Sequence, residues 1–203
     1  MPGRRALPRL VPMRAGGATA TLRERIVAAA VELTTAHGWA HVTMARLADQ
    51  VGVSRQTVYN EIGGKNALAE AMILAELERF LGVVDRAFAE QPDDLPAAIE
   101  VAARSVLELA QDNRLLHAVV SATHGADTEL LPLLTTHAGT LLATAKLVIE
   151  ERVATYDVAL EPERLDAAID MVVRVVLSHV MQPSGSPERT AADISWIAAR
   201  VLR

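Results

Sequence analysis

The sequence predicts an all-α fold. Apolar residues recur at helical spacing along most of the chain, and the breaks between these segments fall at Pro, Gly or Asp. No segment sustains the alternation of apolar and polar residues expected of a β-strand. With 203 residues, of which 51% are hydrophobic, the chain is long enough for one medium domain or for a small head and a larger body.

Two short helices open the ordered part of the chain. We expect one over residues 22–36, ending at His37-Gly38, and a second that begins after a capping Thr43. Trp39, between them, is expected to fill the space where the first helices meet. Their inward faces should comprise Ile26, Ala30, Leu33 and His37 in the first helix, and Met44, Leu47, Ala48 and Val51 in the second.

A tight turn and a third helix follow at residues 51–60. Gly52 can adopt the positive φ that ends one helix, and Ser54 can cap the next one. Val53 and Val58 should anchor the third helix inward, and its polar residues should face outward. A helix-turn-helix with polar outward residues on its second helix is typical of proteins that bind DNA. The polar residues are Arg55, Gln56, Thr57, Tyr59 and Asn60.

The rest of the chain predicts longer helices. Their expected ranges are residues 65–90, 95–110, 112–123 with Asp112 as the cap, 127–156, 162–181 and 187–202. We therefore predict a flexible basic arm over residues 1–20, a DNA-binding domain over 21–66 and a ligand-binding and dimerisation domain over 67–203. The arm carries Arg4, Arg5, Arg9 and Arg14, which either enter the minor groove or attract DNA without specificity.

Composition narrows the function classes. Residues 1–65 carry a net charge of +5 and residues 66–203 carry −10, so the attraction for phosphate is concentrated at the predicted helix-turn-helix. The chain has no cysteine, which excludes disulfides and fits a reducing compartment. No apolar run approaches the ~20 residues of a membrane span. We expect a cytoplasmic protein without membrane insertion.

Residues 23–68 resemble the TetR family of bacterial repressors. The resemblance rests on many elements in register: Ile26…Ala29-Ala30…Leu33, His37-Gly38-Trp39, Val42-Thr43-Met44, Leu47-Ala48…Val51-Gly52-Val53-Ser54, Thr57-Val58-Tyr59 and Lys65-Asn66-Ala67-Leu68. It implies a three-helix DNA-binding head followed by about six helices that bind a ligand and dimerise, as in lipid-responsive actinobacterial members. The chain departs from the family pattern after Tyr59, where Asn60, Glu61 and Ile62 replace the usual aromatic or His residues and Phe.

Side-chain chemistry assigns roles within the head. Arg55 and Gln56 are candidates for base edges, because Arg suits guanine and Gln suits adenine. Asn60 is a candidate for either an adenine edge or a phosphate, whereas Glu61 would repel a phosphate. Phosphate donors, or capping groups in the case of Thr43 and Ser54, complete the candidate DNA-binding set: Thr43, Arg46, Ser54, Thr57, Tyr59 and Lys65.

The body predicts an aliphatic ligand. Aromatic residues make up 3% of the chain, so a pocket in the body lacks stacking surfaces and suits a flexible chain such as a fatty acid or acyl derivative. Arg104 either meets a carboxylate head group or pairs with Glu100 or Glu108 on the surface. The candidate lining residues, each of which is otherwise ordinary core, are Met72, Leu77, Phe80, Leu81, Arg104, Val106, Leu116, Val120, Leu134, Leu141 and Met171.

The last two helices predict a homodimer interface. Residues 171–177 are apolar nearly all round, and Ile194, Ile197 and Val201 lie on an apolar stripe of the final helix. Two such pairs would build a two-fold bundle that matches the half-sites of a palindromic operator.

Other function classes are less well supported by the sequence. Gly64-Lys65 lacks the rest of a phosphate loop, and the histidines have no metal-ligand spacing, so neither an enzyme, a cofactor nor a metal is expected. Two alternatives stay open. One is an architectural DNA binder without a ligand, and the other is a helical carrier or enzyme whose head no longer binds DNA.

Overall fold

The computed structural model describes residues 20–122 and 131–202, except for the side chains of residues 119–122, 131–138, 140 and 141. All regular elements in these ranges are helices, which confirms the predicted all-α fold. They are α1 (Leu22–His37), the short 3₁₀ helix η1 (Trp39–His41), α2 (Met44–Val51), α3 (Arg55–Ile62), α4 (Lys65–Glu90), α5 (Leu95–Gln111), α6 (Arg114–Ala122), α7 (Leu131–Val153), α8 (Pro162–Met181) and α9 (Pro187–Val201).

The predicted helix starts agree with the structure where a capping residue marks them. The side chains of Thr21, Thr43, Ser54, Asp94 and Ser186 each accept a hydrogen bond from a backbone N–H in the first turn that follows. These bonds satisfy N–H groups that have no partner within their own helix.

Two predicted helix boundaries were wrong, one at the start of α6 and one at the end of α7. Asn113, not Asp112, caps α6, because the Asn113 Oδ1 accepts a bond of 2.8 Å from the Leu116 N–H. The helix predicted to reach Tyr156 ends at Val153. Tyr156 turns back instead, and its hydroxyl donates to the Gln91 carbonyl at 2.7 Å while its ring packs edge-on against Phe88. Burial in this corner raises the pKa of Tyr156.

The head packs around one core. Its five largest fully buried side chains are Ile26, Val42, Leu47, Val58 and Leu68. Trp39 is 4% exposed, which confirms its predicted place in this core. His37 was wrongly assigned to the inward face of α1, because the helix ends there and the imidazole is exposed.

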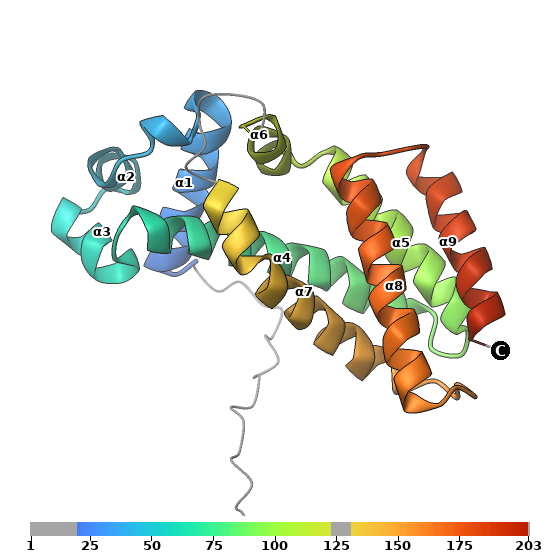
Figure 1. The fold of residues 1–203 in the computed structure, drawn as a ribbon. Helices are drawn as coiled ribbons and strands as arrows, with labels where there is room; N and C mark the ends of the chain where they lie inside the picture. The colour runs from blue at the N-terminus through green and yellow to red at the C-terminus, as the bar shows by residue number, and fades with distance from the viewer. Residues whose placement is uncertain (1–19, 123–130, 203) are drawn as a thin grey trace, which may run out of the picture.

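The helix α4 carries the chain from head to body, as Figure 1 shows. Its first turns belong to the head core through Leu68, Ala69, Ala71 and Met72, and its last turns belong to the body core through Val84 and Phe88. The head core therefore extends beyond residue 66, at least to Met72. The division into domains at residues 66 and 67 stays a prediction.

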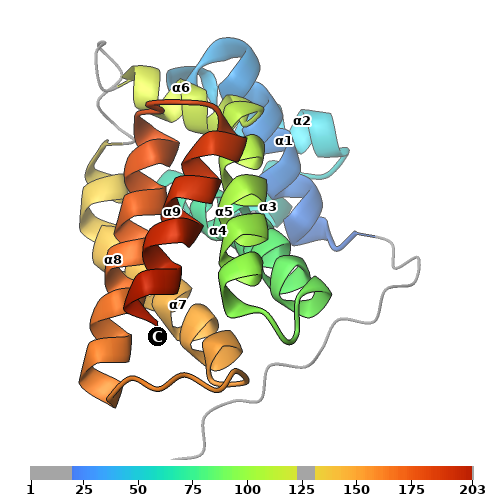
Figure 2. The ribbon, with the colours of Figure 1, turned by 90° about the vertical axis from the view of Figure 1, so that its right-hand side faces the viewer.

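The body is built around α5, which packs most extensively against α4 and α9 (Figure 2). Small residues such as Ala98, Ala102 and Ala103 are buried on α5 and allow its neighbours to approach closely. The Ser195 hydroxyl of α9 donates to the Pro96 carbonyl of α5 at 2.8 Å. Over the described residues, no helix is long and apolar enough to cross a bilayer.

Candidate DNA-reading surface

The turn between α2 and α3 has the geometry predicted for it. Gly52 lies in the left-handed region with φ of 78°, and its N–H and that of Val53 both donate to the Ala48 carbonyl. The Ser54 Oγ accepts a bond of 3.1 Å from the Thr57 N–H and lies 2.8 Å from the Thr57 hydroxyl. A residue with a Cβ would be strained at Gly52, so the crossing of α2 and α3 depends on this glycine.

The helix α3 separates apolar anchors from polar side chains. Val58 is 0% and Ile62 is 6% exposed, and both belong to the head core. Ile62 therefore occupies the inward position at which the family usually has Phe. The exposed residues of α3 are Arg55, Gln56, Tyr59, Asn60 and Glu61, whereas Thr57 is half-buried.

The exposed side chains of α3 form two pairs. The Arg55 guanidinium lies 5.6 Å from the centroid of the Tyr59 ring, and the Gln56 amide donates to the Asn60 carbonyl oxygen at 3.0 Å. Both pairs have i, i+4 spacing, so each pair shares one face of the helix. Together they present a guanidinium, two amides and a phenol, which are groups suited to base edges and phosphates.

Thr43, Arg46 and Lys65, which were also predicted to contact DNA, lie in the first turns of α2 and α4. The Thr43 Oγ1 accepts a bond of 3.2 Å from the Arg46 N–H, so Thr43 caps α2. The Arg46 Nη1 donates to the His41 carbonyl at 3.3 Å. Lys65 begins α4 with its ammonium 5.0 Å from the centroid of the Trp39 ring, which links the start of α4 to the head core.

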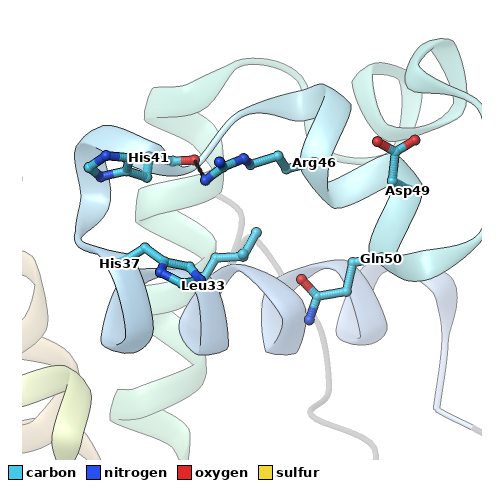
Figure 3. Close-up of a pocket in the computed structure, with 6 residues that line it drawn as sticks. All are labelled: Leu33, His37, His41, Arg46, Asp49 and Gln50. Atoms are coloured by element: carbon cyan, nitrogen blue, oxygen red, sulfur yellow. Dashed lines mark hydrogen bonds between the residues drawn. The ribbon is translucent and has the colours of Figure 1, made fainter.

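Apart from the exposed surface of α3, the head has a depression between the end of α1 and α2 (Figure 3). It is an open groove of about 620 Å³ and is lined by Leu33, His37, His41, Arg46, Asp49 and Gln50. Gln50 also donates to Glu32 at 2.7 Å. Because five of its six lining residues are polar and two of them carry opposite charges, the groove does not resemble the apolar site predicted for the body.

Sequence reasoning missed Arg23 and Arg25 of α1. The Arg23 Nη1 donates to the Glu61 carbonyl of α3, and the Arg25 Nη2 donates to the Val51 carbonyl of α2, each at 2.7 Å. Their positions at the start of α1 gave no local signal, because the bonds span 38 and 26 residues of sequence.

The predicted ligand residues are dispersed. Met72 is buried in the head core, Val106 is buried in the body core, and Met171 is 62% exposed on α8. Leu77, Phe80 and Leu81 are half-buried along α4. Arg104 pairs with Glu108 at 3.9 Å, as the surface alternative predicted. The side chains of Val120, Leu134 and Leu141 lie outside the described ones.

A cavity of about 180 Å³ lies where α5 and α6 meet the turn between α8 and α9. Leu116 lines it, together with Leu107, His117, His179, Val180 and Met181 among others. Among the candidates predicted from sequence, Leu116 therefore borders a cavity. The described residues contain no cluster of His, Cys, Asp and Glu that could hold a metal ion.

The outer faces of α8 and α9 carry large apolar side chains. Met171 is 62%, Trp196 58% and Ile197 54% exposed. Val175, Leu177, Met181 and Val201 are also exposed. The Arg200 guanidinium stacks 3.7 Å from the centroid of the Trp196 ring. An apolar surface of this kind on one side of a body is typical of a protein-association surface.

Comparison with known proteins matches both the head and the body of the chain to known families. Residues 26–72 match the family described as bacterial regulatory proteins, tetR family. Residues 94–200, which are more than half of the chain, match the C-terminal domain of the bacterial tetracyclin repressor.

Individual relatives agree with these matches. The HTH-type transcriptional regulator AlkX of Mycobacterium tuberculosis is 25% identical over 176 residues, which are 87% of this chain and 82% of that protein. The crystal structure of the TetR family repressor AlkX from Dietzia sp. has a TM-score of 0.70 at 24% identity, over 88% of this chain and 98% of the other. FadR from Bacillus halodurans has a TM-score of 0.53 at 17% identity, over 92% and 99%. From its helix-turn-helix, its helical body and these matches, the chain belongs to the TetR family of transcriptional regulators.

Proposed function

We propose that this protein is a cytoplasmic, non-enzymatic repressor that binds a palindromic operator as a homodimer and is released by a small aliphatic ligand. The observation that carries the proposal is the separation on α3, where buried Val58 and Ile62 hold the helix and the pairs Arg55/Tyr59 and Gln56/Asn60 face outward. A short helix anchored in this way suits the major groove.

The outer faces of α8 and α9 support the dimer. Two copies joined across these faces would bury Met171, Val175, Trp196 and Ile197, which are exposed in one copy. The two-fold axis would then relate two copies of α3, as a palindrome requires.

The ligand class rests on the body's composition and on the names of relatives. The body core is built mainly from Ala, Val, Leu and Ile, and Phe88 is its buried aromatic among the described residues. AlkX from Dietzia sp. is implicated in biodegradation of n-alkanes, and FadR is a fatty acid degradation regulator. A fatty acid or acyl derivative fits both considerations.

The described cavity is smaller than such a ligand needs. Its volume of about 180 Å³ is below the ~300–1,000 Å³ typical of ligand sites. We propose that the ligand enters beside Leu116 and extends along α4 past Leu77, Phe80 and Leu81, with Val120, Leu134 and Leu141 as further contacts. A ligand there would shift α4, and Lys65 would carry the shift into the head.

DNA binding is tested by operator selection. The wild-type protein should select a palindromic sequence from a pool of random duplexes. The double variant Arg55→Ala/Tyr59→Ala should bind it at least ~100-fold more weakly, because each half-site loses a base contact of ~1–3 kcal/mol at Arg55 and a phosphate contact at Tyr59. Arg86→Ala, which changes an exposed arginine of α4 outside the head and the proposed dimer interface, is the control. Equal operator affinity in the double variant and the wild type, with matching circular dichroism, would remove these residues from the site.

Ligand response is tested by release of the selected operator. C12–C18 fatty acids should release labelled operator, and the operator should weaken fatty-acid binding by the same factor. 2-Naphthoic acid is a flat aromatic control with the same head group. Release by the naphthoate but not by the fatty acids would show that the aliphatic assignment is wrong.

A further inference from the structure

Two arginines of α1 tie down both helices of the helix-turn-helix. Arg23 bonds to the Glu61 carbonyl in the last turn of α3, and Arg25 bonds to the Val51 carbonyl that ends α2. The two guanidinium groups come from one helical turn of α1. They connect α1 to the ends of two helices that are adjacent in space but far from α1 in sequence.

These carbonyls are the groups that most need such partners. The last carbonyls of a helix have no donor within the helix. The N–H groups of the residues that follow α2 and α3 donate to other carbonyls. The Gly52 and Val53 N–H groups donate to the Ala48 carbonyl, and the Gly63 N–H donates to the Tyr59 carbonyl. A cation at a helix C-terminus also interacts favourably with the helix dipole, and a charged donor forms a stronger bond than a neutral one.

Few buried side chains hold α3 in its orientation. The helix contains 8 residues, and two of them, Val58 and Ile62, are buried. It is ~12 Å long, so a tilt of ~10° about Val58, near its middle, would move the Arg55 end and the Glu61 end by ~1 Å each, and a bond at Glu61 resists such a tilt. A recognition constellation has to be held to within ~0.5 Å, so a tilt of this size would separate Arg55 and Gln56 from their base edges.

We propose that Arg23 and Arg25 are positioning residues that set the sequence specificity of the head by fixing α3 and α2 against α1, without themselves contacting bases. This inference rests on the proposed DNA-binding function. The competing role for exposed arginines at this place is a direct contact to DNA phosphates, since a guanidinium with one bonded N–H retains other donors.

The two roles differ in salt dependence and in specificity. A lost phosphate contact lowers affinity for every duplex and lowers the salt slope by ~0.9 per contact, which is ~1.8 for a dimer. A lost positioning contact lowers affinity for the operator alone and leaves the salt slope unchanged. The ratio of operator affinity to affinity for unrelated DNA therefore distinguishes them.

The experiment compares Arg23→Gln, Arg25→Gln, the corresponding lysine variants and the control Arg86→Gln, which changes an exposed arginine of α4. Each protein is titrated with the duplex selected by the wild type and with a scrambled duplex of the same length, from 50 to 200 mM salt. The Gln variants should lose about tenfold or more in operator affinity and less than about twofold on scrambled duplex, with the salt slope unchanged. The lysine variants, which keep a charged donor, should recover part of the loss. Unchanged operator affinity, or equal losses on both duplexes with a lower salt slope, would overturn the proposal.

A measurement without DNA tests the positioning claim separately. In the free protein, amide hydrogen exchange at Val58 and Ile62 should accelerate about fivefold or more in Arg23→Gln, since a hydrogen bond contributes ~1 kcal/mol. Exchange in α5 should not change. Unchanged exchange in α3 would overturn the positioning role even if DNA binding falls. If the wild type selects no sequence but the acceleration is seen, the proposed operator binding fails and the positioning of α3 stands.

Discussion

The head and the body of this protein use their apolar residues in opposite ways. Among the side chains that the structure describes, the five largest fully buried ones all lie in the head, between Ile26 and Leu68. Among the exposed large hydrophobic residues, Tyr59 is in the head, and the rest lie on α4, α7, α8 and α9. The head has thus completed its core within one chain and presents polar groups outward, whereas the body still exposes apolar surface. This difference is consistent with the proposal that the head binds a polar partner, DNA, and that the body associates through its apolar surface with a second copy.

The largest expected effect tests whether the exposed apolar surface of the body forms the dimer. Val175→Asp combined with Ile197→Asp should convert the proposed dimer to monomers, because carboxylates would be buried without partners at the centre of the apolar surface. Light scattering checks the mass, and the head should keep its fold by circular dichroism. Glu163→Lys, an exposed change at the start of α8, is the control. A monodisperse dimer of the double variant would move the interface away from α8 and α9.

A smaller effect is expected when the same change, leucine to alanine, is made in the core of the head and in the core of the body. Leu47→Ala in the head removes a side chain that is 0% exposed, and we expect a loss of ~3–5 kcal/mol. Leu107→Ala in the body is expected to lose ~2–3 kcal/mol, because Leu107 already borders the 180 Å³ cavity. Urea unfolding measures both variants. A larger loss at Leu107 would contradict the view that the head is the more tightly packed region.

The smallest effect concerns an exposed ion-pair cluster in the body. The bond from Arg174 at 2.7 Å, assisted by Lys146 at 3.6 Å, lowers the pKa of Asp170. A lowered folded-state pKa stabilises the protein above the unfolded pKa of ~3.9, and this stabilisation is lost as the pH falls through the folded pKa. Asp170→Asn should therefore be slightly less stable than the wild type at pH 7, and the difference should disappear as the pH falls below ~4. Thermal unfolding from pH 7 to 2 checks this, and a difference that does not shrink as the pH falls below ~4 would point to a cause other than charge.

The sequence alone determined the local structure of this protein. The helix starts at Thr43 and Ser54 and the turn at Gly52 depend on capping groups and backbone freedom, which are properties of short segments. The inward places of Trp39 and Val58 followed from apolar spacing for the same reason. The family resemblance of residues 23–68, confirmed by the family match over residues 26–72, also depends on local motifs.

Only the tertiary structure decided which distant groups meet. Arg23 and Arg25 reach carbonyls 38 and 26 residues away, and no local pattern encodes such a bond. Tyr156 leaves its helix to bond Gln91, and Met72 joins the head core although it follows the predicted boundary. The candidate ligand residues dispersed for the same reason, because helical spacing tells which face of a helix is apolar but not which neighbour covers it. That choice depends on how the helices cross, which is settled by packing across the whole chain.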